Sequence, residues 1–133
     1  MAERSVFETV GAGFFVDLVD RFYDAVENDP VLIPLYPDGA DTLHARERLA
    51  MFLAQYWGGP HEYMERRGHP MLRARHNQWT IGARERDRWL VHMLAALDAV
   101  MAGSTLAPQE RDDVHAEVSA YLVNAAEHLR NAD

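Results

Sequence analysis

The most informative run in the chain is Phe52-Leu53-Ala54-Gln55-Tyr56-Trp57-Gly58-Gly59-Pro60. Its apolar residues continue the stripe of an amphipathic helix that is expected from about Asp41 to Trp57. The Gly-Gly-Pro triplet that follows should stop this helix firmly. From Pro60 to Gly82 no helical period is sustained, although several large apolar residues occur there. An irregular stretch of this length in a compact domain is usually functional, so we expect it to pack against something.

Three further helices are predicted on either side of this run. The first has an apolar stripe formed by Phe14, Phe15, Leu18, Val19, Phe22, Tyr23 and Val26. A short corner follows from Val31 to Pro37, with prolines at positions 30, 34 and 37. The other two helices cover about Ala83 to Ala102 and the residues from Pro108 onward, where proline suits the first turn. Because no segment alternates with period two, the sequence predicts a single all-α domain over residues 1–133, with an irregular loop at about 58–75.

Composition excludes several classes of function. The 133 residues are 48% hydrophobic and contain no cysteine, so a core can form without disulfides, thiolate nucleophiles or cysteine-ligated zinc. The net charge of −8 opposes binding to nucleic acid or to an anionic membrane. No apolar run could span a bilayer and no signal-peptide pattern begins the chain, so a cytoplasmic location is expected. Motifs for zinc proteases, phosphate loops and serine nucleophile elbows are also missing.

The basic residues are all arginine, and seven of the 13 lie between Arg66 and Arg88. A local basic region in an acidic protein favours a small anionic ligand, although a solvated loop with surface ion pairs would look the same. Within this region His76 has Arg73 and Arg75 as close neighbours, and a neutral imidazole is a standard axial ligand of haem iron. Nearby Trp79 could cover the face of a flat cofactor. The plainer alternative is a surface or capping histidine.

Three hydrogen-bond donors are predicted to lie in or beside the core. Tyr23 ends the first apolar stripe, so its buried hydroxyl should need a partner. Tyr36 lies in the proline-rich corner, and Trp89 opens the stripe of the third helix with an indole N–H that can only donate. Each of these residues alone is typical of a core. Together they predict an apolar pocket with three donors.

The chain resembles the truncated haemoglobins, specifically the group II (O-type) branch of bacteria. The runs that carry the resemblance are Arg21-Phe22-Tyr23, Leu35-Tyr36-Pro37, Glu47-Arg48-Leu49, Gln55-Tyr56-Trp57-Gly58-Gly59-Pro60, Arg67-Gly68-His69-Pro70, Arg75-His76 and Glu85 to Leu90. The resemblance covers about residues 5–130. It implies a 2-on-2 α-helical sandwich around haem b, with an extended loop before the proximal helix.

The resemblance also implies roles for individual residues. His76 matches the proximal iron ligand, and Tyr23, Tyr36 and Trp89 match the distal donors of this branch. The cofactor-contacting set would comprise Ala45, Arg48, Leu49, Phe52, Leu53, Tyr63, Arg73, Arg75, Trp79 and Met93. Among these, Ala45 matches the position of the distal histidine of many other globins and Leu49 would cover the distal face. Arg48 and Tyr63 would lie at the haem edge, and Arg73 and Arg75 would face the propionates.

The function implied is binding of dioxygen, carbon monoxide and nitric oxide, with slow release from the Tyr/Tyr/Trp pocket. An alternative is redox catalysis, either peroxidase-like with hydrogen peroxide or as a nitric-oxide dioxygenase. Since the globin uses up the 133 residues, turnover would require a separate reductase. Oxygen transport, a sensor role through a partner protein, and a monomer or homodimer all stay open at this stage.

Overall fold

The structure is a computed structural model that describes residues 5–36, 41–61 and 80–132. Its elements in chain order are α1 (Val6–Val10), α2 (Ala12–Val26), the 3₁₀ turn η1 (Ile33–Leu35), α3 (Leu43–Tyr56), α6 (Ala83–Ala102) and α7 (Pro108–Leu129). Over these described ranges the chain is helical and has no strand, which confirms the all-α prediction.

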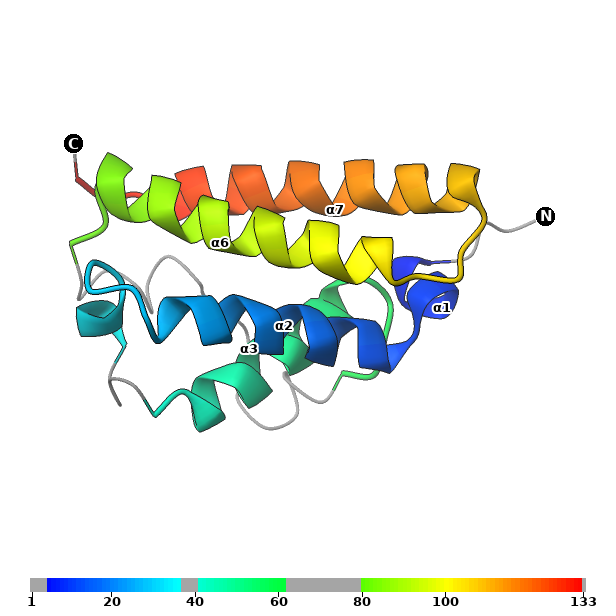
Figure 1. The fold of residues 1–133 in the computed structure, drawn as a ribbon, viewed down its shortest axis with the longest axis horizontal. Helices are drawn as coiled ribbons and strands as arrows, with labels where there is room; N and C mark the ends of the chain where they lie inside the picture. Colours follow the sequence, from blue (N-terminus) through cyan, green and yellow to red (C-terminus); the bar gives the residue numbers. More distant parts are fainter. Residues whose placement is uncertain (1–4, 37–40, 62–79, 133) are drawn as a thin grey trace.

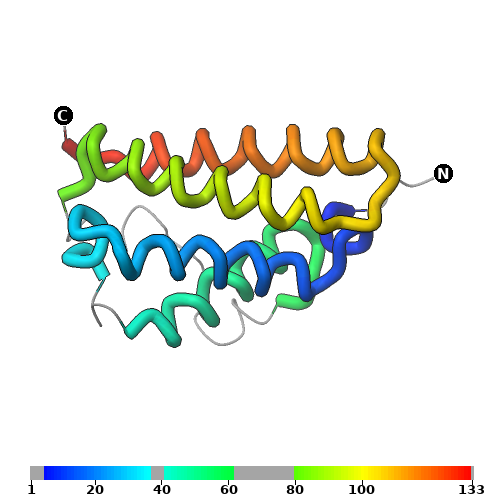
Figure 2. Tube along the Cα trace, in the orientation of Figure 1, coloured from blue at the N-terminus to red at the C-terminus, as the bar shows by residue number. Residues whose placement is uncertain are grey.

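The long helices form two antiparallel pairs. α2 and α3 run in opposite directions in one layer, and α6 and α7 do so in the other (Figure 1). α2 is the central element because it packs against both α3 and α6, while α7 packs against α6. The tube in Figure 2 shows the same order, with α1 beside the start of α2. This two-over-two arrangement brings the C-terminal half of α2 close to the start of α6.

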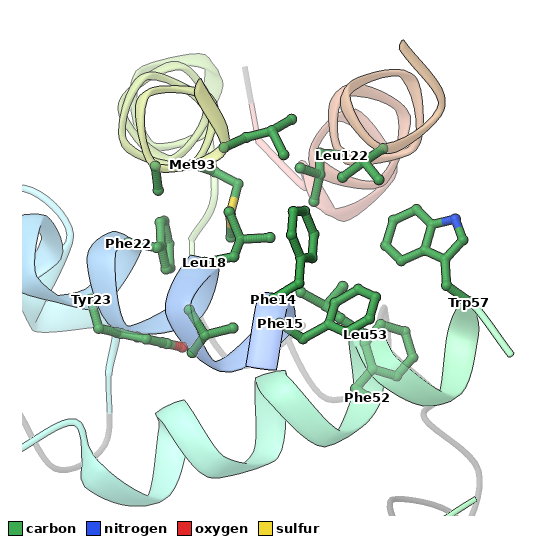
Figure 3. Close-up of a cluster of buried hydrophobic side chains, with 14 of the residues drawn as sticks. Phe14, Phe15, Leu18, Phe22, Tyr23, Phe52, Leu53, Trp57, Met93 and Leu122 are labelled. Atoms are coloured by element: carbon green, nitrogen blue, oxygen red, sulfur yellow. The ribbon is translucent and has the colours of Figure 1, made fainter. Parts of the chain in front are cut away.

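The apolar stripe predicted for the first helix forms the centre of the core. Phe14, Phe15, Leu18, Val19, Phe22, Tyr23 and Val26 are all buried on α2. They meet Phe52 and Leu53 of α3 on one side and Met93 and Leu122 of the upper layer on the other (Figure 3). Full burial of each such side chain contributes about 1.5–3 kcal/mol, so this stripe fixes the position of α2 between the two layers.

The Gly-Gly-Pro stop ends α3 as predicted. Gly58 has a φ of 100°, and its N–H donates to the carbonyl of Gln55 at 3.2 Å. The Gly59 N–H donates to the Ala54 carbonyl at 2.7 Å, which completes a Schellman motif. A Cβ on Gly59 would lie 2.7 Å from that same carbonyl oxygen and 2.7 Å from the ring of Phe7. Glycine is therefore required where α1 crosses the end of α3.

Two features differ from the predicted pattern. α1 is a separate five-residue helix whose N-terminus is capped by the Ser5 hydroxyl, which accepts from the Glu8 N–H at 3.1 Å. Tyr56, expected within the apolar stripe, is 52% exposed. Its ring lies against that of Tyr121 on α7, with centroids 4.1 Å apart, so it covers a surface seam rather than the core. None of the helices in the described ranges is long and apolar enough to cross a bilayer.

Candidate functional site

The three predicted donors meet at one end of the structure. Tyr23 comes from α2, Tyr36 directly follows η1, and Trp89 lies in the second turn of α6. The Tyr23 and Tyr36 rings pack edge to face with centroids 5.5 Å apart, and each side chain shifts the pKa of the other. The Trp89 side chain also acts on the Tyr36 hydroxyl and lowers its pKa. The Phe22 ring packs edge to face against Trp89 with centroids 5.3 Å apart. In Figure 3 the Tyr23 side chain lies between the ribbons of α2 and α3.

The three groups also act on one another electrostatically. The Tyr36 side chain lowers the pKa of Tyr23, whereas Tyr23 raises the pKa of Tyr36. The Trp89 side chain lowers the pKa of Tyr36, as expected for an indole N–H, which can only donate. All three side chains thus bring donor groups to the same place.

Both phenols stay protonated at ordinary pH. Burial raises the pKa of Tyr23 to about 12, against smaller lowering effects from Tyr36, Arg48 and Arg46. Burial likewise raises the pKa of Tyr36 well above its usual value, although the residue as a whole is only half-buried. The site therefore offers neutral donors rather than phenolate charges.

α3 supplies the wall beside these donors. Ala45 and Leu49 are half-buried and pack against the core, one turn apart on the helix. Arg48 is half-buried, and its charge acts on the Tyr23 hydroxyl. Phe52, Leu53 and Met93 are buried. The remaining predicted residues, His76, Tyr63, Arg73, Arg75 and Trp79, lie outside the described residues.

A first polar cluster, missed by the sequence analysis, joins α2 to α3. Arg46 is 18% exposed and reaches Asp20 at 3.2 Å, Asp24 at 2.9 Å and Glu27 at 3.1 Å. Its Nε donates to the Thr42 hydroxyl at 2.8 Å. The guanidinium carbon also lies 5.8 Å from the centre of the Tyr23 ring, within cation–π range. The acidic residues spaced three and four apart on α2 were the available signal, since such a row can face one cation.

A second polar cluster, also missed, joins the end of α2 to α6. Asp29 is 2% exposed, and both its oxygens accept from Arg88 Nε, at 3.0 and 2.9 Å. His92 Nε2 lies 2.6 Å from Oδ2, and the Val31 N–H donates to Oδ1 at 2.9 Å. Burial alone would raise the pKa of Asp29, but these hydrogen bonds outweigh it and hold the pKa well below the usual range. The only sequence signal was an aspartate before proline, which is common in ordinary turns.

Comparison with known proteins gives these residues a context. Residues 5–122 match the bacterial-like globin family. The chain is 42% identical over 94 residues to the group 2 truncated hemoglobin YjbI of Bacillus subtilis (strain 168), an alignment that covers 71% of this chain and 70% of that protein. The structure resembles the thermostable hemoglobin of the actinobacterium Thermobifida fusca with a TM-score of 0.85 at 48% identity, over 96% of this chain and 97% of that one. It also resembles the truncated oxygen-avid haemoglobin of Bacillus subtilis with a TM-score of 0.82 at 34% identity, over 96% of this chain and 100% of that one.

The chain therefore belongs to the bacterial-like globin family, and its relatives are group II truncated haemoglobins with the 2-on-2 fold. The resemblance read from the sequence is confirmed. Membership implies a haem cofactor and gaseous ligands. The described residues fit such a group, because neutral, buried and half-buried donors suit a small polar ligand, Ala45 and Leu49 supply apolar contacts, and half-buried Arg48 can face an anionic edge.

Proposed function

We propose that this protein binds dioxygen at haem b and releases it slowly, because Tyr23, Tyr36 and Trp89 surround the ligand with hydrogen-bond donors. The observation that supports this most directly is the convergence of the three side chains, with the Tyr23 and Tyr36 rings in contact and both phenols neutral. Haem, when bound, supplies the iron that holds diatomic gases. A relative of this chain is named oxygen-avid, which agrees with the proposal.

The donors are expected to act through the polarity of the ligand. A hydrogen bond to a charged acceptor is worth about 1.5–3 kcal/mol. Two such bonds would slow escape by roughly 10² to 10⁴, at about 1.4 kcal/mol for each factor of ten. Carbon monoxide is less polar when bound and should gain less. The ratio of the two release rates therefore measures what the donors contribute.

His76 is the proposed proximal ligand of the iron. Arg73 and Arg75 are proposed as partners of the propionates, with Arg48 and Tyr63 at the haem edge. Ala45, Leu49, Phe52, Leu53, Trp79 and Met93 are proposed as apolar contacts of the ring. The single globin domain, the cytoplasmic location and the monomeric or dimeric state remain predictions from the sequence.

The test is spectroscopic and kinetic. The purified protein should show a Soret band near 400–430 nm, ferric and after reduction, and should form a stable complex with dioxygen. Tyr23→Phe and Trp89→Phe should each speed dioxygen release by about tenfold, the equivalent of one hydrogen bond of roughly 1.4 kcal/mol. His76→Ala should lose haem or change its spectrum. Unchanged release rates in both distal variants would refute the slow-release mechanism.

A second candidate is a redox enzyme, favoured by the contact of two phenols with an indole acting on one of them. Donors held near a bound peroxide assist cleavage of its O–O bond, which suits a peroxidase, and the same pocket could serve a nitric-oxide dioxygenase with an external reductase. Turnover of hydrogen peroxide should then exceed that of free haem and fall in Tyr23→Phe. A rate equal to that of free haem would exclude the peroxidase.

A further inference from the structure

The Asp29 cluster, formed by Asp29, Arg88 and His92, lies where the proline-rich corner meets α6. Asp29 is almost completely buried, whereas the Arg88 and His92 side chains are 45% and 21% exposed. An ionised carboxylate can only accept, so both α6 side chains donate to it. The buried carboxylate of Asp29 thus accepts hydrogen bonds from two side chains of α6, which lies in the other layer of the fold. Asp29 is not one of the three donors and does not lie on α3 beside them, so its burial requires a separate explanation.

On the corner side, backbone hydrogen bonds connect Asp29 to Tyr36. The Asp29 carbonyl accepts from the N–H groups of Leu32 at 3.2 Å and Ile33 at 3.0 Å. The carbonyl of Leu32 then accepts from Leu35 at 2.9 Å, and that of Ile33 accepts from Tyr36 at 3.1 Å. Leu32 is 1% exposed and anchors the corner in the core. A displacement of Asp29 would therefore be carried to Tyr36.

On the helix side, Arg88 and His92 lie one turn apart on α6 and so point the same way. Trp89 is the residue next to Arg88, and its side chain acts on the Tyr36 hydroxyl. The Asp29 cluster thus holds the corner that carries Tyr36 against the helix that carries Trp89. A shift of this cluster would change the position of Tyr36 relative to Trp89.

We propose that Arg88 and His92, through Asp29, are positioning residues that hold the Tyr36 hydroxyl at the Trp89 indole. The inference rests on the proposed function, since it assigns these residues to the geometry of the distal donors. A role in stability alone would leave the position of the Trp89 indole unchanged, so the two roles are distinguished by a readout at Trp89. The ion pairs of Asp29 with Arg88 and His92 fix the position of the corner relative to α6.

The test uses the full-length protein in its carbon-monoxide form and the variants Arg88→Gln and His92→Gln. Their side chains are partly exposed, so both should fold. Arg86→Gln is the matched control, since Arg86 lies on the same helix but pairs with Asp87 and with Glu127 of α7. The first readout is the Trp89 indole N–H signal in a ¹H–¹⁵N spectrum, where the chain's three tryptophans give three signals and Trp89→Phe identifies one.

We expect the Trp89 signal to move and its hydrogen exchange to quicken by about fivefold or more in Arg88→Gln and His92→Gln, as for loss of one hydrogen bond of ~1 kcal/mol. Dioxygen release should quicken by a similar factor, while Arg86→Gln stays near wild type in both readouts. An unmoved indole signal in both cluster variants would overturn the inference. If the wild type took up no haem, the proposed function would fail instead, and the indole signal of the purified protein would still decide whether the cluster holds Trp89.

Discussion

Replacement of Arg46 by glutamine tests whether the contact between α2 and α3 depends on one side chain. Arg46 has polar contacts with Asp20, Asp24, Glu27 and Thr42, including the backbone carbonyl of Asp20 at 3.1 Å. Asp20 and Asp24 are 51% and 71% exposed, so each of these ion pairs is worth only a few tenths of a kcal/mol. The bonds to Glu27, Thr42 and the Asp20 carbonyl are better shielded, and each contributes about 0.5–1 kcal/mol.

These contributions predict a loss of roughly 2 kcal/mol in the free energy of unfolding for Arg46→Gln. For 133 residues the unfolding entropy is about 0.28 kcal/mol per kelvin, so Tm should fall by about 7 °C. Arg84→Gln is the matched control, because Arg84 is 75% exposed and pairs only with its neighbour Glu85 among the ion pairs of the described residues. Its Tm should stay within about 1–2 °C of wild type.

The assay is thermal unfolding followed by circular dichroism, with all proteins in the same haem and ligand state because bound ligands shift Tm. Repeating it at 1 M salt should shrink the difference between Arg46→Gln and wild type, since salt screens the exposed pairs with Asp20 and Asp24. A Tm for Arg46→Gln equal to that of Arg84→Gln would refute the reasoning, as the Arg46 contacts would then contribute nothing to the α2–α3 layer.

Three further predictions concern the turn after α3 and the response to pH. Gly59→Ala should destabilise the fold by roughly 1–3 kcal/mol, measured by urea unfolding, because the added Cβ would overlap the Ala54 carbonyl and the Phe7 ring. Ultraviolet titration should show that the tyrosines at positions 23, 36 and 121 ionise at higher pH than a free tyrosine. Because their pKa values are higher in the folded than in the unfolded protein, the free energy of unfolding should fall as pH rises from about 10 to 12. Tyr121→Phe should remove one late-titrating group. Ionised Asp29 should stabilise the fold at pH values above its unfolded pKa of 3.8, and this effect should be lost as pH falls through its lower folded pKa. In Asp29→Asn the free energy of unfolding should therefore depend less on pH in the acid range.

The sequence predicted the helices well where one apolar face is buried along its whole length. Every member of the α2 stripe, from Phe14 to Val26, is buried, because α2 lies between α3 and α6 and needs apolar contacts along its length. The end of α3 was equally predictable, since a glycine with positive φ leaves a local signal. By contrast, Tyr56 was assigned to the core because a period of 3.6 does not distinguish a buried seam from an exposed one.

The two polar clusters could not be predicted from the sequence, for a different reason. Asp29 lies 59 and 63 residues before Arg88 and His92, so no local period or spacing connects them. The Arg46 cluster spans up to 26 residues between two helices, and only one acidic row hinted at it. The residues alone predicted Tyr23, Tyr36 and Trp89 as donors of one apolar pocket, and the family resemblance gave them their distal role. Their mutual contacts follow from the tertiary packing alone.

The two clusters act on different members of the same set of donors. Arg46 holds α2 against α3 and contacts the Tyr23 ring, whereas Asp29 holds the corner of Tyr36 against the helix that carries Trp89. The three donors thus come from different segments, and none is placed by its own helix alone. A ligand pocket built this way needs polar contacts between layers, because apolar packing tolerates small shifts that would misalign a hydrogen bond. We therefore expect Arg46→Gln and Arg88→Gln each to change the rate of dioxygen release by more than their effects on stability alone would suggest. In the double variant the two effects on the free energy of activation for release should add only if the two clusters hold Tyr23 and Tyr36 independently.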